Sequence, residues 1–201
     1  MEIEQEYNQI FSNKDADFNP QIMRFLSNVL KYKKTGTVLD IGAGLGQNSI
    51  FLAKNGFQVE AMDISDESVK IIKEKSVGLN ILVRKSDIKT EPLVSDYDII
   101  ISSFILHHFT KKERNAFFEM IQKHTTQGGL NIVSVFVAKE EPFEKTNEKG
   151  YPIYLLKSDE MKEVYSKWEV LNFEQIYSKP LYPSKPPLVE YTETILTRKP
   201  L

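Results

Sequence analysis

Cysteine is absent from the 201 residues, which excludes disulfides, thiolate nucleophiles and cysteine-ligated metals. We therefore assign no metal ligands. A basic excess is also missing, because 26 Lys and Arg stand against 28 Asp and Glu for a net charge of -2. A protein that binds nucleic acid through its phosphates usually shows a basic patch or stripe. We therefore expect no nucleic-acid partner.

Long apolar runs are absent too. The apolar run 99–106 contains two serines and is far shorter than the roughly 20 residues that a membrane-spanning helix needs. Residues 1–6 lack the basic and apolar segments of a secretory signal. We expect no membrane association and a cytoplasmic location.

The composition is that of an ordinary globular protein, with 41% hydrophobic and 27% charged residues. A chain of this length fits one domain comfortably. We expect a single domain over 1–201, with an N-terminal lid and helix region (1–35), a ligand-binding core (36–138) and a C-terminal helix and hairpin (139–201). The sequence fits a monomer or a weak homodimer.

Apolar segments and helical patterns alternate along most of the chain, which is typical of an α/β fold with a doubly wound, mostly parallel sheet. Two β-rich stretches near the C-terminus follow a late helix and predict an antiparallel hairpin that completes a seven-stranded sheet. The expected strands are 37–40, 57–63, 81–84, 97–102, 130–138, 169–177 and 190–198. The expected helices begin near Pro20 and cover 47–55, 65–75, 110–123 and 158–167.

A glycine-rich segment, Val38-Leu-Asp-Ile-Gly-Ala-Gly-Leu-Gly-Gln-Asn48, joins the first strand to a helix. Glycines there allow a tight turn and let a ligand approach the backbone closely. Gln47 occupies the position where a dinucleotide-binding loop has its third glycine. A carboxylate at Asp40 would sit badly beside a pyrophosphate but suits a cationic ligand. Both features favour S-adenosylmethionine (SAM), which carries an ammonium and a sulfonium and no phosphate.

Two further acids follow the next two strands. Asp63 comes 21 residues after Gly42, where an acid can accept hydrogen bonds from ribose hydroxyls. Asp87 could accept from an adenine amino group, with Ile64 and Ile88 packing against the base. A lone Asp after a strand is more often a turn former, but three acids at one sheet edge favour a nucleoside site.

These segments resemble class I SAM-dependent methyltransferases, whose motifs are matched by 40–46, Asp63, Asp87 and the string Ser102-Ser-Phe-Ile-Leu-His-His-Phe109. The resemblance covers about 35–140 and implies a Rossmann-like sheet. Segments 47–56 and 156–169 are similar to the tellurite-resistance methyltransferases, which methylate tellurium and selenium oxyanions. The resemblance implies that the methionine part of SAM is held by the glycine loop and the chain near Ser103, with expected cofactor contacts at Asp40, Gly42, Ala43, Gly44, Gly46, Asn48, Asp63, Ile64, Asp87, Ile88 and Ser103.

His107 and His108 come just after the fourth strand, beside the expected position of the transferred methyl. Histidine titrates near neutral pH, so either could take a proton from the acceptor or position it, and His108 is the stronger candidate. Packing at the strand end is the alternative. Tyr7, Phe11 and Phe18 precede the first helix in a segment that could fold over the cofactor as a lid.

The sequence therefore favours a SAM-dependent methyltransferase that acts on a small-molecule acceptor, with a tellurite- or selenite-type oxyanion as one candidate. In the family the late hairpin carries a His/Arg cluster, whereas 179–188 here offers Lys179 and Lys185. Two alternatives stay open, namely an NAD(P)-dependent oxidoreductase and a non-catalytic SAM-binding protein.

Overall fold

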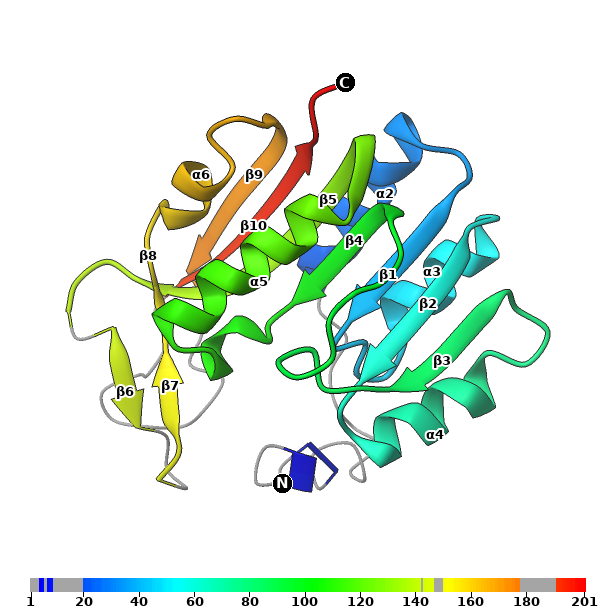
Figure 1. The fold of residues 1–201 in the computed structure, drawn as a ribbon, viewed down its shortest axis with the longest axis horizontal. Coiled ribbons are helices and arrows are strands. Elements are labelled where there is room, and N and C mark those ends of the chain that lie inside the picture. The colour runs from blue at the N-terminus through cyan, green and yellow to red at the C-terminus, as the bar shows by residue number, and fades with distance from the viewer. Residues whose placement is uncertain (1–3, 6, 9–19, 142, 147–149, 178–190) are drawn as a thin grey trace.

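A computed structural model describes the chain except for residues 1–3, 6, 9–19, 142, 147–149 and 178–190. Figure 1 shows one mixed sheet with helices on both faces. The helical elements are α2 (Pro20–Tyr32), α3 (Gln47–Lys54), α4 (Asp66–Lys75), the 3-10 turn η1 (Leu106–His108), α5 (Lys111–Lys123) and α6 (Glu160–Val164). The strands are β1 (Thr37–Ile41), β2 (Gln58–Asp63), β3 (Ile81–Lys85), β4 (Tyr97–Ser103), β5 (Thr125–Ala138), β6 (Glu144–Thr146), β7 (Pro152–Tyr154), β8 (Leu156–Lys157), β9 (Glu169–Tyr177) and β10 (Tyr191–Arg198).

The sheet has the order β3-β2-β1-β4-β5-β10-β9. The first five strands of this path run parallel, and β10 is antiparallel to both β5 and β9. The predicted fold is therefore confirmed, including the C-terminal hairpin. The two-residue strand β8, which pairs with β5, makes the sheet eight-stranded and was not predicted. The division into three regions of one domain stays a prediction.

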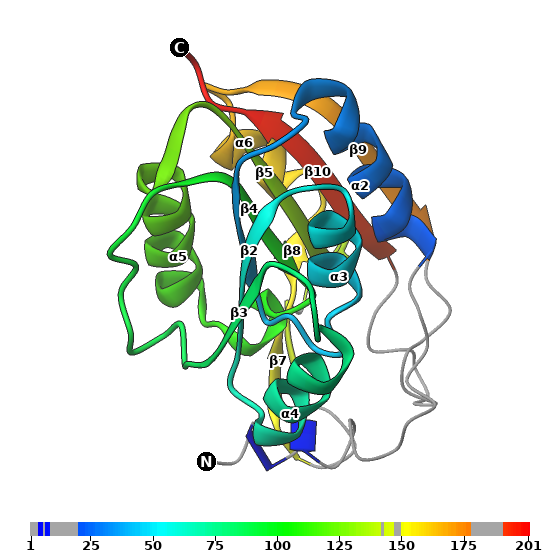
Figure 2. The same cartoon turned by 90° about the vertical axis from the view of Figure 1, so that its right-hand side faces the viewer.

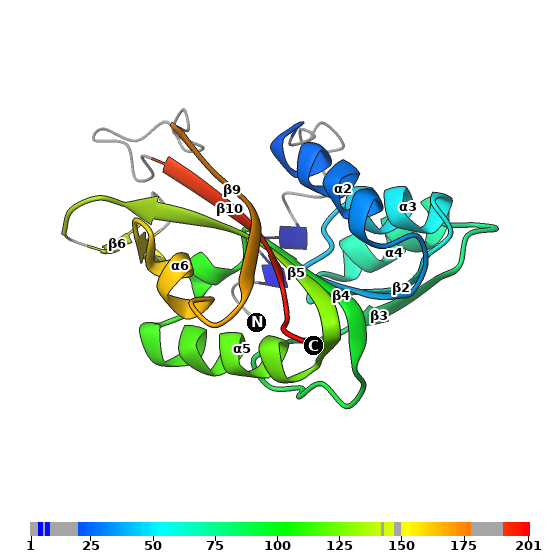
Figure 3. The same ribbon diagram turned by 90° about the horizontal axis from the view of Figure 1, so that it is seen from above.

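Helices α2, α3 and α4 cover one face of the sheet, and α5 and α6 cover the other (Figures 2 and 3). Alternate residues of β1 pack into the hydrophobic cores on the two faces of the sheet, because successive side chains in a strand point to opposite faces. Leu39 and Ile41 join the cluster with Phe117 of α5, whereas Val38 joins the cluster with Leu52 of α3. Asp40 shares the face of Val38 and therefore points toward α3.

Local sequence signals set the starts of two helices. The Ser65 hydroxyl accepts a hydrogen bond from the Ser68 N–H at the start of α4, and Thr110 and Glu113 form a reciprocal capping box at the start of α5. Such caps satisfy N–H groups that a helix leaves without partners. Two predictions missed their boundaries: α6 is shorter than 158–167, and β5 begins at Thr125 instead of residue 130. The short β6–β7 hairpin was also not predicted.

The parallel strands all end at one edge of the sheet. The chain turns to β2 and β3 on one side of β1 and to β4 and β5 on the other, so β1 and β4 flank a topological switch point. Open α/β sheets bind ligands outside the carboxyl ends of their strands at such a point. The fold thus brings the chain that follows Ile41, Asp63 and Ser103 to the expected ligand-binding edge. Among the described helices, none is both long and apolar enough to cross a membrane.

We expect Leu39→Ala to lower the free energy of unfolding by about 2–5 kcal/mol, because Leu39 is fully buried on β1 and the substitution leaves a cavity. Leu82→Ala on β3 is the matched control, since Leu82 is 64% exposed and its truncation should change stability by no more than about 0.5 kcal/mol. Urea unfolding followed by circular dichroism measures both. Equal losses would contradict this placement of the core.

Candidate functional site

The glycine turn between β1 and α3 bends back over β2. Gly42, Gly44 and Gly46 all have positive φ, at 68°, 55° and 77°. Residues other than glycine rarely adopt such backbone angles. The N–H groups of Gly42 and Ala43 both donate to the Met62 carbonyl oxygen, at 2.9 and 3.0 Å. The turn is therefore fixed to the end of β2 by its own backbone.

Two of these glycines also lack room for a side chain. A Cβ at Gly42 would lie 2.4 Å from Cγ2 of Ile105, and one at Gly46 would lie 2.9 Å from Cγ1 of Ile72. The turn thus packs closely against the β4–η1 connection on one side and α4 on the other. Its close packing holds the backbone of the turn in place at the sheet edge.

Asp40 lies buried beneath this turn, with 1% of its surface exposed. Its Oδ2 accepts a hydrogen bond of 2.6 Å from the Ser49 hydroxyl of α3, whereas Oδ1 is buried with no hydrogen-bond partner among the described residues. Burial raises the pKa of Asp40 to about 6, although the side chains of Ser49 and Asn48 oppose the rise. A buried carboxylate oxygen without a partner is costly and is the kind of atom that a bound cation would satisfy.

Asp63 links the glycine turn to the start of α4. Its Oδ2 accepts from the Gly44 N–H at 2.8 Å and its Oδ1 accepts from the Ser65 N–H at 2.9 Å. Burial raises the pKa of Asp63, and these two hydrogen bonds counteract it. Each carboxylate oxygen can accept more than one hydrogen bond, so the side chain can still receive a ligand hydroxyl. Ile64 follows it and is half-buried.

Asp87 and Ile88 lie in the connection that follows β3. The Ser86 N–H donates to the Asp63 carbonyl oxygen at 2.9 Å, which ties this connection to the end of β2. The Asp87 Oδ1 accepts from the Lys89 N–H at 2.9 Å, so Asp87 does form a turn, as the alternative interpretation held. Ile88 packs against the core on the α5 side.

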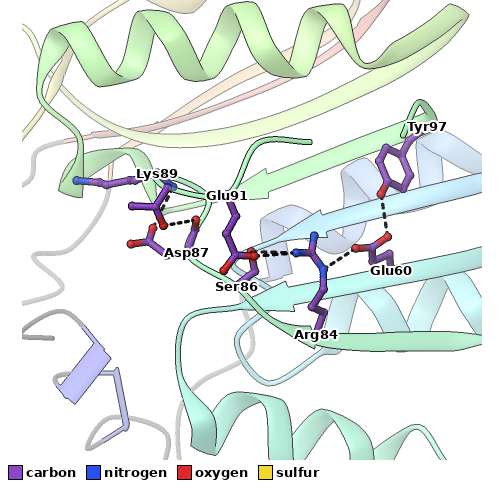
Figure 4. Close-up of polar contacts among 8 residues, drawn as sticks. Glu60, Arg84, Ser86, Asp87, Lys89, Glu91 and Tyr97 are labelled. Carbon is purple, nitrogen blue, oxygen red and sulfur yellow. Dashed lines mark hydrogen bonds and ion pairs between the residues drawn. The ribbon is translucent and has the colours of Figure 1, made fainter. Parts of the chain in front are cut away.

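A network of polar side chains holds the base of the same connection (Figure 4). Arg84 of β3 donates to Glu60 of β2 at 3.0 Å and to Glu91 at 3.0 Å. Glu91 also accepts from the Ser86 hydroxyl at 2.8 Å, and Glu60 accepts from the Tyr97 hydroxyl at 2.8 Å. These contacts fix both ends of the segment 86–91 that carries Asp87.

The end of β4 carries polar groups that the protein leaves without partners. The hydroxyls of Ser102 and Ser103 and the Nδ1 of His107 are buried and have no hydrogen-bond partner among the described residues. Phe104, at a φ of 57°, leaves the strand and stacks on Phe136 of β5 at 4.8 Å between ring centres. Polar groups that are buried without partners commonly mark a place where a ligand binds or catalysis occurs.

His107 and His108 lie together in η1, with ring centres 3.9 Å apart. Burial and the neighbouring His108 hold the pKa of His107 well below its usual value. Burial, followed by the positive charge of Lys89, lowers the pKa of His108 to about 4. Both imidazoles are therefore neutral at pH 7, and each has a nitrogen that can accept a proton.

Three described residues of the N-terminal segment contact this same edge. The Tyr7 hydroxyl lies 2.9 Å from Nε2 of His108. Asn8 accepts from the Ser65 hydroxyl at 2.6 Å, and Glu4 pairs with Lys85 at 2.6 Å. Tyr7 thus lies beside His108. The lid stays a prediction, and Phe11 and Phe18 lie outside the described residues.

The structure gathers the predicted residues along one edge of the sheet. They are Asp40 in β1, Gly42, Ala43, Gly44 and Gly46 on the turn, Asn48 in α3, Asp63 and Ile64 at the end of β2, Asp87 and Ile88 after β3, and Ser103, His107 and His108 at and after the end of β4. Sequence reasoning missed Ser49 and Lys89. Ser49 could have been found, because the first turn of α3 faces back toward β1. Lys89 had no such signal, since its side chain reaches η1 from a distant part of the chain.

This chain is similar to known proteins in both sequence and fold. The sequence profile of the family described as tellurite resistance protein TehB matches residues 7–179. The chain belongs to the TehB family. The probable S-adenosyl-L-methionine-dependent methyltransferase TehB of Haemophilus influenzae (strain 10810) is 27% identical over 143 residues, which cover 69% of this chain and 48% of the relative. The chain thus spans about half the length of the curated relatives that it matches first.

Solved structures share the fold. The crystal structure of TehB from Haemophilus influenzae has a TM-score of 0.77 at 22% identity and covers 96% of this chain and 67% of its own. Magnesium protoporphyrin IX methyltransferase from Synechocystis PCC 6803, solved with bound S-adenosylhomocysteine (SAH), has a TM-score of 0.70 at 17% identity and covers 98% of each chain. This chain therefore has the TehB-type fold of class I SAM-dependent methyltransferases.

We expect Gly42→Ala to destabilise the protein by at least about 2 kcal/mol, because alanine adds both positive-φ strain and the contact with Ile105. Gly56→Ala is the matched control: Gly56 has a φ of 92°, but a Cβ there meets open space. It should cost only the backbone strain, roughly 1–2 kcal/mol. Urea unfolding compares them. Equal losses would show that the turn is not tightly packed.

Proposed function

We propose that this chain is a SAM-dependent methyltransferase that transfers a methyl group to a small-molecule acceptor. The observation that carries the proposal is the buried Asp40 carboxylate, one oxygen of which has no hydrogen-bond partner in the described part of the chain and lies beneath a turn with three positive-φ glycines. A cationic ligand would pair with that oxygen, whereas the carboxylate would repel a pyrophosphate. Family membership supports the same conclusion, because the named TehB relatives are probable SAM-dependent methyltransferases.

Each group of site residues would contact a different part of SAM. The glycine turn (Gly42, Ala43, Gly44, Gly46), Asn48 and the chain at Ser103 would hold the methionine part, with its ammonium nearest Asp40. Asp63 would accept from the ribose hydroxyls. Asp87 would accept from the adenine amino group, while Ile64 and Ile88 pack against the base. The positions of Asp63, Asp87 and Ile88 near the carboxyl ends of the strands support these roles.

Bound SAM supplies an activated methyl group. The chain's own contribution is to orient the acceptor and exclude water, and orientation alone can supply roughly 7–11 kcal/mol of the barrier. Neutral His108, assisted by His107, would take the proton of an acceptor that carries one at its attacking atom. With a pKa of about 4, His108 is unprotonated throughout the neutral range but is a weak base.

The acceptor class that family membership suggests is an oxyanion of tellurium or selenium. Such an acceptor attacks through a lone pair and needs no base. Of the described basic residues, Lys89 reaches η1, and its ammonium is already bonded to the His108 carbonyl oxygen and to Glu113. The predicted cations Lys179 and Lys185 lie outside the described residues. An assay with a panel of tellurite, selenite and protic thiol or amine acceptors would separate these classes.

SAM or SAH at about 100 times its dissociation constant should stabilise the protein by roughly 2.7 kcal/mol, which corresponds to a rise in Tm of roughly 5–10 °C for a chain of this length. NADH and NADPH should give none, and methyl transfer from labelled SAM to one acceptor of the panel should follow. A larger shift with a nicotinamide cofactor would favour an oxidoreductase. Binding of SAM without transfer to any acceptor would favour a non-catalytic SAM-binding protein.

Asp40 gives the binding a characteristic pH dependence. Because its pKa is about 6, affinity for SAM should fall as the pH drops below 6, by up to about tenfold per unit, since the carboxyl must lose its proton to face a cation. The raised pKa also means that the ionised carboxyl costs stability, a cost that is absent at low pH and complete above pH 6.

Asp40→Asn should therefore stabilise the free protein at pH 8, by up to roughly 2–3 kcal/mol, and yet bind SAM more weakly and without the pH dependence. Calorimetric titration between pH 5 and 8 and urea unfolding at pH 8 measure the two effects. Ser49→Ala is a control that keeps the carboxylate but removes its hydrogen bond. Unchanged SAM affinity in Asp40→Asn would refute the assignment of the ammonium to this residue.

A further inference from the structure

Lys89 joins two parts of the site that lie far apart in the sequence. Its backbone N–H donates to Oδ1 of Asp87 at 2.9 Å. Its side-chain ammonium donates to the His108 carbonyl oxygen at 2.7 Å and pairs with Glu113 of α5 at 3.3 Å. One residue therefore holds both the carboxylate on the nucleoside side and the turn that carries the histidine pair.

The hydrogen bonds around Asp87 leave the backbone of its turn little conformational freedom. The Asp87 carbonyl oxygen accepts from the N–H groups of Thr90 and Glu91 at 3.0 and 2.9 Å, which closes a tight turn around Lys89. Arg84 and Ser86 anchor Glu91 at the far end of that turn. A ligand that donates to the Asp87 carboxylate would share that group with the Lys89 N–H, because the rest of the turn is fixed.

The contacts on the His108 side are equally confined. The Lys89 side chain is 25% exposed, and its ammonium lies 4.7 Å from the centre of the Phe109 ring. Among the residues that the structure describes, the charged or titratable groups that face His108 are the Tyr7 hydroxyl, the His107 ring and the Lys89 ammonium with Glu113 behind it. Lys89 is the charge that, after burial, keeps His108 neutral.

We propose that Lys89 is a positioning residue that couples occupancy of the nucleoside side at Asp87 to the position and charge environment of His108. This inference rests on the proposed function for the identity of the nucleoside. Through Lys89, the adenine end of a bound cofactor would influence the acceptor end, which lies on a different strand connection.

The coupling is tested by following the His108 ring by NMR in the full chain, with and without SAH, in the wild type and three variants. Lys89→Met removes charge and donor, Lys89→Gln keeps a donor without the charge, and Lys89→Arg keeps both. Lys111→Met is the matched control, because it removes an exposed positive charge from the first turn of α5. Calorimetry measures SAH affinity for each protein.

In the wild type, SAH should shift the His108 resonances, and Lys89→Arg and Lys111→Met should preserve that shift. Lys89→Met should abolish it, raise the pKa of His108 by at least roughly half a unit and weaken SAH binding by roughly two- to tenfold. Lys89→Gln should raise the pKa as Lys89→Met does but retain part of the SAH-induced shift.

Two results separate this inference from the proposed function. Failure of SAH to bind the wild type would refute the proposed cofactor. Normal SAH binding with no change at His108, or with the same change in Lys89→Met, would overturn the coupling while leaving the cofactor assignment intact. An unchanged pKa of His108 in Lys89→Met would overturn the charge part of the proposal without reference to any ligand.

Discussion

The site depends on a backbone constraint at the end of β1. The chain must leave β1, cross the end of β2 and enter α3 within a few residues, and it does so by placing three glycines at positive φ. Asp63 then stabilises the turn by accepting a hydrogen bond from the Gly44 N–H. Because Gly42, Gly44 and Gly46 carry no side chains, a ligand can approach the backbone of the turn closely, with Asp40 buried below it. A side chain at Gly42 would collide with Ile105.

The local part of this arrangement could be predicted from the sequence, because it depends on neighbouring residues. Gly42, Gly44 and Gly46 predict the turn, and Ser65 and Thr110 predict the starts of helices. The acids that follow successive strands indicate one edge of the sheet, since parallel strands end together. The prediction of seven strands missed β8, whose two residues carry no periodic pattern. The predicted end of α6 at residue 167 was too late, because its apolar pattern continues past the point where the helix stops.

The contacts made across the fold could not be predicted. Nothing near Lys89 in the sequence indicates that its ammonium lies on the His108 carbonyl oxygen, since the two residues meet only after β4 is laid beside β1. The depressed pKa values of His107 and His108 arise from burial that is a property of the whole edge. The sequence could point to histidine as a candidate base, but the charge state of each imidazole is set by packing.

The electrostatics of the edge have a common direction. Burial favours the neutral form of four groups there, raising the pKa of Asp40 and Asp63 and lowering that of His107 and His108. A cationic ligand would favour the ionised form of Asp40. The same cation would further oppose protonation of the histidines, because like charges repel across a poorly solvated site. Ligand binding and neutral imidazoles thus favour each other, and the cation, like burial, makes both histidines weaker bases.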